Sequence, residues 1–392
     1  MCYPVVSNNK MERSIESSNT PLTISNSRLK FIDAGRSIAI LLMLVNHFIT
    51  LTIDKSSFDN NSSLYLIWVF VKGFTGPMFF SITGIIFVYL LCRNNHENFF
   101  KINRVKKGFR RSIELLFWGY LLQLNIQDFN QYITLEFNSW VFAFHVLQCI
   151  GIGIILILLI FGIFKLINVG KLHTYYLITG TIMFLLYPSL KELPQETFFP
   201  NNTFEMFQNM LKGVYSVFPI VPWVAFVLYG AAVGALIHHY KDYITSKRGY
   251  IIFILCGLAL NFLPWLILTA LDSIFDTNFV ISSGLIARFG QVVVVVGILI
   301  LLDKYFKSNS LFLRIGANTL PIYIIHVMIL YSGFWGIGIN QILKNALTPL
   351  ESIFGASFFS AFFIILVNYY HYFEVTWSKF KTKIRRIMFL SL

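Results

Sequence analysis

The chain has 392 residues, of which 56% are hydrophobic and only 12% are charged. Soluble globular proteins carry about 25% charged residues, so this chain has too few of them to cover a water-exposed surface. The net charge of +13 at pH 7 lies in gaps between apolar segments, which indicates membrane topology and an anionic ligand and excludes nucleic acid as a partner.

Apolar segments of helical length recur from residue 31 to residue 373. They are rich in Phe, Ile and Leu and lack the two-residue alternation of β-barrel strands. We therefore predict an all-α integral membrane protein with about ten transmembrane helices. These helices are expected near residues 31–53, 64–91, 112–126, 140–164, 174–190, 213–237, 249–270, 281–302, 314–338 and 353–373.

The distribution of basic residues predicts that both termini are cytoplasmic. The segment 93–111, after the second predicted helix, holds seven Lys and Arg residues, whereas the segment after the third holds none. The other even-numbered helices are also followed by basic residues, and cytoplasmic loops carry this excess. We predict that residues 1–28 form a disordered cytoplasmic tail, that 29–375 form the membrane domain and that 376–392 form a basic cytoplasmic tail.

The first predicted helix carries ionisable residues, which require a partner, a water-filled cavity or a function to lie in a membrane. An ionised side chain in hydrocarbon costs about 2.5–3.5 kcal/mol. Arg36 and His47 are eleven residues apart, which places them within about 20° of one helix face with a rise of about 16 Å. That rise is comparable to the reach of a pantetheine arm. Asp33 can pair with Arg36 across one turn, and Asn46 precedes His47 directly.

Other predicted helices place ionisable residues at two depths. The outer group, at a depth similar to that of His47, consists of Lys72, His145, Arg288 and His326. The inner group consists of Arg36, Arg110, Arg111, Glu114 and Arg314. Together they predict a polar cavity with an anion site at its cytosolic mouth and a histidine further out. Each member taken singly also has a structural interpretation, because His145 and His326 are typical of packed histidines, Lys72 can snorkel, and Arg110 and Arg111 can act as topology determinants.

An imidazole suits acyl transfer because histidine gains and loses its proton near neutral pH. It can remove the proton of an attacking hydroxyl or amine, or carry the acyl group itself. The sequence contains no context for a nucleophilic serine, a P-loop, a zinc protease or a dinucleotide fold. Cys2, Cys92, Cys149 and Cys256 have no metal-ligand spacing, so no metal is expected.

The segment RLKFIDAGRSIAILLMLVNH (28–47) resembles the first helix of the transmembrane acyltransferase superfamily. In that helix an acidic residue precedes an Arg, and a His follows the Arg after ten intervening residues. Further segments resemble the branch related to heparan-α-glucosaminide N-acetyltransferase, a relative of acyltransferase family three. These are FTGPMFFSITGIIF (74–87), FHVLQCIGIGIIL (144–156), FPIVPWVAFVLYGAAVG (218–234) and IGANTLPIYIIH (315–326).

The resemblance implies that an acyl-CoA, usually acetyl-CoA, binds from the cytosol and that its acyl group passes to a glycan or similar acceptor at the far face. His47 takes the place of the superfamily's motif histidine and Arg36 that of its arginine. In the heparan-acetylating enzymes the residue at the position of the motif histidine resembles an asparagine, and the catalytic histidine follows in the next loop. The loop 54–63 here has no histidine, which makes His47 the candidate and argues against heparan as the substrate.

We therefore expect a multi-pass acyl-CoA-dependent O- or N-acyltransferase, in the plasma (inner) membrane if the host is bacterial. His47 is the candidate catalytic residue, supported by Asp33, Arg36 and Asn46. The candidate acyl-CoA-binding residues are Arg36, Arg110, Arg111 and Arg314, and the candidate acceptor-side residues are Lys72, His145, Arg288 and His326. The expected partners are membrane lipid, acyl-CoA and a glycan, and homo-oligomerisation is left open. The alternatives are a transporter of an anionic solute, although no two-fold repeat of broken helices is present, and a degenerate scaffold or sensor.

Overall fold

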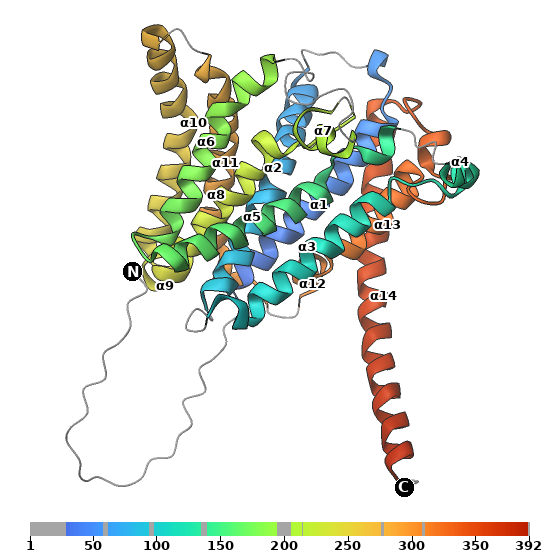
Figure 1. The fold of residues 1–392 in the computed structure, drawn as a ribbon. Helices are drawn as coiled ribbons and strands as arrows, with labels where there is room; N and C mark the ends of the chain where they lie inside the picture. The colour runs from blue at the N-terminus through green and yellow to red at the C-terminus, as the bar shows by residue number, and fades with distance from the viewer. Residues whose placement is uncertain are drawn as a thin grey trace, which may run out of the picture.

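A computed structural model describes residues 29–57, 62–93, 98–134, 139–193, 205–213, 215–275, 278–307 and 310–390, with side chains up to residue 370. The predicted tail 1–28 lies outside these residues. In the described part the chain is helical and contains no strand, only two isolated β-bridges. The prediction of an all-α fold is therefore confirmed (Figure 1).

Most helices lie where the apolar segments predicted them. The long ones are α1 (Lys30–Thr52), α2 (Ser63–Cys92), α3 (Asn103–Leu121), α5 (Val146–Ile167), α6 (Leu172–Glu192), α8 (Ile220–His239), α10 (Lys247–Phe275), α11 (Ser283–Leu302) and α14 (Pro349–Leu390). The shorter ones are α4 (Phe129–Ile133), α7 (Glu205–Lys212), α9 (Lys241–Ile244), α12 (Leu311–Ala317) and α13 (Thr319–Tyr331). Helix α14 continues through the predicted basic tail as far as Leu390.

Seven segments of the described chain are long and apolar enough to cross a membrane, or eight if the bent pair α12 and α13 counts as one. Helices α3 and α6 coincide with the predicted third and fifth spans, but they do not reach this hydropathy. The chain is thus a multi-pass membrane protein, while the count of about ten spans and the cytoplasmic termini stay predictions.

The start of α3 differs from the sequence-based prediction. The sequence suggested a loop through 93–111, but the helix begins at Asn103 and carries much of the basic run. Its residues divide into three faces, as the 3.6-residue period allows. Val105, Gly108, Ser112, Leu115 and Gly119 are buried, and α3 packs on α5. Phe109, Ile113 and Phe117 form an exposed apolar stripe. The third face consists of Arg104, Lys107, Arg110, Arg111 and Glu114.

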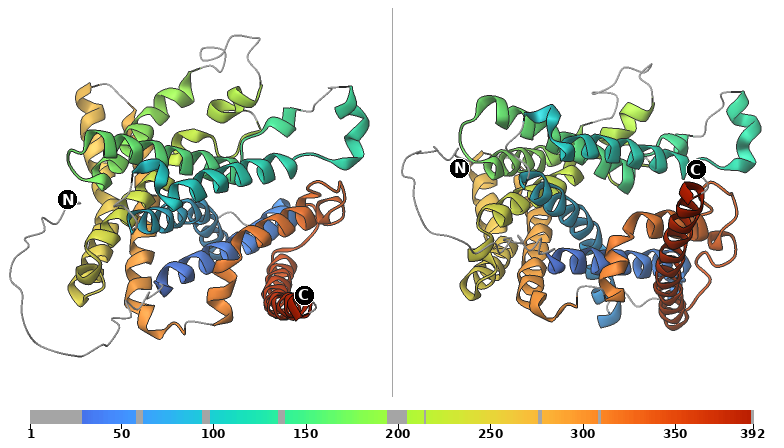
Figure 2. Two further views of the ribbon diagram at one scale, coloured as in Figure 1. Left: turned by 60° about the horizontal axis from the view of Figure 1, so that its bottom comes forward. Right: turned by 90° about the horizontal axis from the view of Figure 1, so that it is seen from below.

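The predicted helix 314–338 is divided in two. Helices α12 and α13 meet at Asn318 with a bend of 77°. Asn318 leaves the helical conformation, and its amide nitrogen donates to the carbonyl oxygen of Arg314 at 2.9 Å. The Ser37 hydroxyl of α1 accepts from the backbone N–H of Gly316 at 2.9 Å. This break lets α12 pack on the start of α1 while α13 runs beside α1 (Figure 2).

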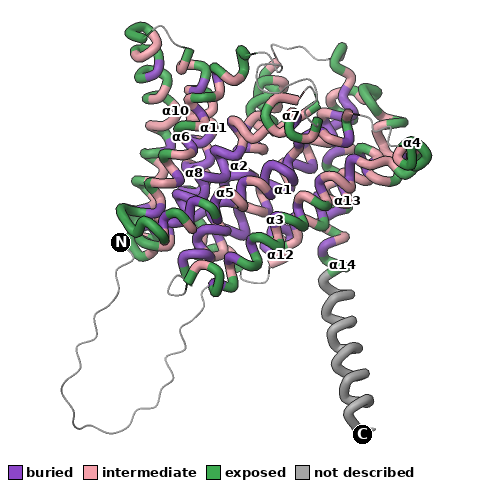
Figure 3. The backbone as a smooth tube through the Cα atoms, in the orientation of Figure 1, coloured by how far each residue is buried: buried purple, intermediate pink, exposed green. Residues whose placement is uncertain are grey.

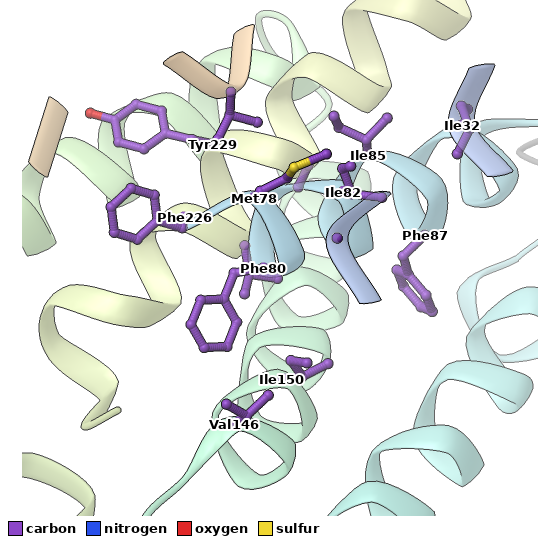
Figure 4. Close-up of a cluster of buried hydrophobic side chains, with 14 of the residues drawn as sticks. Ile32, Met78, Phe80, Ile82, Ile85, Phe87, Val146, Ile150, Phe226 and Tyr229 are labelled. Atoms are coloured by element: carbon purple, nitrogen blue, oxygen red, sulfur yellow. The ribbon is translucent and has the colours of Figure 1, made fainter. Parts of the chain in front are cut away.

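The core is concentrated in α1, α2, α5 and α8 (Figure 3). Within the most apolar stretch of each helix, 78% of the residues of α8 are buried but only 11% of those of α10, so α10 presents most of its surface to lipid. A side chain on Gly84 of α2 would collide with the carbonyl oxygen of Val227, and one on Gly230 with that of Ser81. Small residues therefore bring the α2 and α8 backbones together, with Met78, Phe80 and Phe226 packed around them (Figure 4).

Main-chain hydrogen bonds tie the segments after α13 to the C-terminal ends of α1 and α3. Asn345 and Leu347 donate to the carbonyl oxygens of Leu51 and Thr52, and the N–H of Asp54 donates to Leu347 at 2.8 Å. Phe334 donates to Leu124 and accepts from Ile126. These bonds fix the end of α1 that carries the histidine.

Candidate functional site

His47 of α1 and His326 of α13 form a hydrogen-bonded pair. Nδ1 of His47 lies 2.9 Å from Nε2 of His326, although 279 positions separate them in the chain. The ring centroids are 5.1 Å apart and the ring planes are inclined by 31°. His326 is fully buried and His47 is half-buried, so His47 is the member of the pair that a substrate can reach.

The partners of the two rings define how neutral imidazoles share their protons. Nδ1 of His326 lies 3.2 Å from the backbone carbonyl oxygen of Ile322. A carbonyl oxygen can only accept, so His326 carries its proton on Nδ1 and accepts at Nε2. His47 then donates from Nδ1, and the lone pair on its Nε2 has no hydrogen-bond partner among the described residues. This arrangement orients His47 as a base, in the way that a hydrogen-bonded partner fixes the tautomer of a catalytic imidazole.

Neighbouring side chains hold the histidine pair in place. The amide nitrogen of Asn46 donates to the Thr75 hydroxyl at 2.6 Å and thereby links α1 to α2. The Tyr331 ring lies edge-on to His47 with centroids 5.7 Å apart. Lys72 is close enough to interact electrostatically with His47, and its Nζ lies 4.8 Å from the centroid of the Trp68 ring.

A cavity of about 390 Å³ opens between α1, α2, α3, α5 and α13. Its charged wall comes from Arg36 of α1 and from Arg104, Lys107, Arg110, Arg111 and Glu114 of α3. Apolar residues of α2 and α5 complete the lining, among them Ile82, Phe87 and Ile150 (Figure 4). Arg111 pairs with Glu114 at 3.0 Å. The cavity therefore carries an excess of positive charge and suits an anionic ligand with an apolar portion.

Arg36 is held at the wall of the cavity by residues of α1 and α13. Its Nη2 donates to the Thr319 hydroxyl at 3.0 Å, and its Nη1 lies 3.9 Å from a carboxylate oxygen of Asp33. Asp33 is buried. The predicted Asp33–Arg36 pairing is present in the structure.

The histidine pair does not line the cavity but lies beyond its lining on the same two helices. Tyr323 lines the cavity, and its ring meets that of His326 edge-on with centroids 4.9 Å apart. Tyr323 and His326 are three residues apart on α13, or about 4.5 Å along the helix axis. On α1, Arg36 and Ala39 line the cavity and His47 lies two turns further on. Along both α1 and α13, the residues that line the cationic cavity are followed by the histidine of the pair.

The structure brings together only part of the predicted site. Arg36, Arg110 and Arg111 share the cavity, and His326 contacts His47. Arg314 does not line the cavity. Arg288 lines a second cavity, and His145, beside Trp140 at the start of α5, is joined to the histidine pair by no hydrogen bond or ring contact of the described residues.

Sequence reasoning missed Arg104, Lys107, Thr319 and Tyr323 as lining residues. Their signal was present, because positions 104, 107 and 111 recur at helical spacing and 319, 323 and 326 do so as well. Within the described ranges, no group of three or more His, Cys, Asp or Glu residues could hold a metal ion.

The family model for the catalytic region of heparan-alpha-glucosaminide N-acetyltransferase matches residues 28–263. The match covers more than half of the chain and contains α1, with Arg36 and His47, together with α2, α3, α5 and α8. No curated protein matches the chain closely enough to add to this comparison. The chain belongs to the family of the heparan-α-glucosaminide N-acetyltransferase catalytic domain.

Proposed function

We propose that this membrane protein transfers an acyl group, most simply acetyl, from cytosolic acyl-CoA to a hydroxyl or amine of a carbohydrate at the far membrane face. The observation that carries the proposal is the oriented imidazole of His47 beyond a cation-lined cavity. The family match supports acyl transfer over transport of an anionic solute, because the family is one of acetyltransferases.

The donor would lie with its phosphates against the basic face of α3 and with its pantetheine arm directed along α1. Arg104, Lys107 and Arg110 supply charges that suit phosphate groups. The apolar wall contributed by α2 and α5 suits the uncharged arm. A volume of about 390 Å³ falls in the range of about 300–1,000 Å³ typical of small-molecule sites.

The acceptor would meet the thioester at His47. As its oxygen or nitrogen attacks the thioester carbonyl carbon, Nε2 of His47 takes the proton. The tetrahedral intermediate then collapses, the C–S bond breaks and the CoA thiolate leaves. His326 would hold the His47 ring and stabilise the imidazolium by accepting from its Nδ1–H. Lys72 would favour the negative charge that develops on the carbonyl oxygen.

The experiment is an acetyl-transfer assay with purified protein in nanodiscs, radiolabelled acetyl-CoA and extracted cell-envelope glycans. We expect His47→Ala to lower kcat by about 10²- to 10⁴-fold, the usual contribution of a general base. His239→Ala, at the exposed end of α8, is the matched control and should keep wild-type activity. Transfer that survives His47→Ala would remove His47 from this role, and absence of acetyl-CoA binding in the wild type would favour a transporter.

A further inference from the structure

A second cavity of about 340 Å³ lies between α2, α6, α8 and α11. Its walls are apolar and aromatic, with Tyr187, Trp223 and Phe226 from α6 and α8, and Arg288 of α11 is its one charged lining residue. The proposed acyl transfer makes no use of this space.

Helix α2 separates this cavity from the histidine pair. Thr75 faces α1, where it accepts from Asn46. Gly73 and Pro77 line the second cavity and lie two residues to either side of Thr75, about 160° around the helix. The cavity and His47 therefore lie on opposite sides of α2. The Arg288 site is distinct from the candidate catalytic site.

The Arg288 guanidinium retains unused hydrogen-bond donors. Its Nη1 donates to the backbone oxygen of Phe70 at 3.3 Å and to Oε1 of Gln291 at 3.2 Å. Its Nε and Nη2 have no hydrogen-bond partner, and no carboxylate pairs with it, among the described residues. Gly73 makes room for this group, because a Cβ there would lie 2.7 Å from Nη2. A positive charge within an apolar span is costly, so this arrangement calls for an anion.

The rim of the cavity belongs to the surface that faces lipid. The Phe70 ring lies 5.3 Å from the centre of the guanidinium, and Phe70 and Ile281 are 49% and 41% exposed. Arg288 lies nine residues into the apolar segment Phe279–Tyr305, or about 14 Å from its predicted outer end. Because that segment is about 40 Å long and the hydrocarbon layer about 30 Å thick, Arg288 is within snorkelling reach of the outer interface.

We propose that this cavity binds the phosphate headgroup of an anionic lipid from the outer leaflet. The free Nε and Nη2 of Arg288 form a fork that matches two phosphate oxygens. Trp223 and Tyr187 have the amphipathic rings that suit the boundary between headgroup and acyl chain. The acyl chains leave the cavity past Phe70 along the exposed face of α2.

The test uses the purified full chain in nanodiscs and measures quenching of tryptophan fluorescence by brominated acyl chains. Brominated phosphatidylglycerol is compared with brominated phosphatidylcholine at the same low mole fraction. The chain has seven Trp residues, so the part of the quenching that is lost in Trp223→Phe reports on this cavity. We expect phosphatidylglycerol to quench that part at about fivefold lower mole fraction than phosphatidylcholine in the wild type.

The preference should disappear in Arg288→Gln and persist in Arg248→Gln, an exposed arginine at the start of α10. Equal quenching by the two lipids in the wild type would overturn the proposal without any need of a variant. Competition by inorganic phosphate at millimolar concentration would also overturn it, because the site would then bind a soluble anion. Arg288→Gln that elutes as a monodisperse species and keeps the preference would remove Arg288 as the recognition group.

Discussion

His326 differs from His47 in what a substrate can reach. It is fully buried and contacts His47, Tyr323 and the backbone of Ile322. It lies outside the segment matched by the family model. On this geometry we propose that His326 is a positioning residue that acts through His47, because a buried hydrogen-bonded partner of this kind commonly fixes both ring orientation and tautomer.

We predict that His326→Phe lowers kcat by roughly tenfold or more and leaves KM for acetyl-CoA unchanged, because the donor cavity stays intact while His47 loses its acceptor. His326→Gln should restore part of the rate, since its amide oxygen can accept from His47 Nδ1. Steady-state kinetics over a pH series are the measurement. A structural role alone would predict equal losses in both variants and an unmoved pH–rate profile.

Among the elements, α3 combines three environments on one helix. Its buried face packs on α5, its apolar stripe is exposed, and its basic face lines the donor cavity. Placing cations on a helix rather than in a loop fixes their spacing to one another and to Arg36, which favours recognition of a polyphosphate.

We predict that the double variant Lys107→Gln/Arg110→Gln raises KM for acetyl-CoA by about three- to tenfold with little change in kcat, because it removes ground-state binding. It leaves the Arg111–Glu114 pair intact. The salt dependence of KM should also flatten, since both residues are exposed and screened by ions. Arg248→Gln is the control, and a change in kcat alone would place these residues outside donor binding.

The packing of α2 on α8 gives a prediction about stability. A Cβ at Gly84 would strike the main chain of α8, which cannot move aside as a flexible side chain could. We expect Gly84→Val to destabilise the protein by at least about 1–3 kcal/mol, the usual cost of overpacking. Thermal unfolding in detergent is the measurement. Gly284→Ala, where a Cβ meets no atom within 4 Å, should be neutral.

At the scale of the whole molecule, the membrane topology depends on whether α3 and α6 cross the bilayer. Helix α1 begins and α14 ends on the same side of the bundle (Figure 1). If both α3 and α6 cross, Thr134, between α3 and α5, lies outside and Ser246 inside, whereas Thr134 lies inside if neither helix crosses. We predict that Thr134→Cys is labelled by a membrane-impermeant maleimide in intact cells, whereas Ser246→Cys is labelled only after permeabilisation. Failure of Thr134→Cys to be labelled in intact cells would contradict the ten-helix topology.

Apolar length predicted α1, α2, α6, α10 and α11 to within five residues at both ends, because hydrocarbon demands helices of about this length. The start of α3 was not predicted, because its charged side chains face a cavity. Hydropathy alone does not distinguish such a charged helical segment from a loop. The break at Asn318 depends on how α12 packs against Ser37. The sequence could place His47 and Arg36 on one face, but the contact between His47 and His326 joins helices far apart in the chain and needed the fold.

The segments that follow α13 are attached to the C-terminal ends of α1 and α3 through main-chain atoms. Such bonds do not depend on which side chains the segments carry, except that proline cannot stand at a donor position. Mutations can therefore change the surface side chains of these segments while α1, which carries His47, keeps its position. Under the proposed function, an evolving lineage could exchange one acceptor for another by altering that surface and still inherit the same chemistry beneath it.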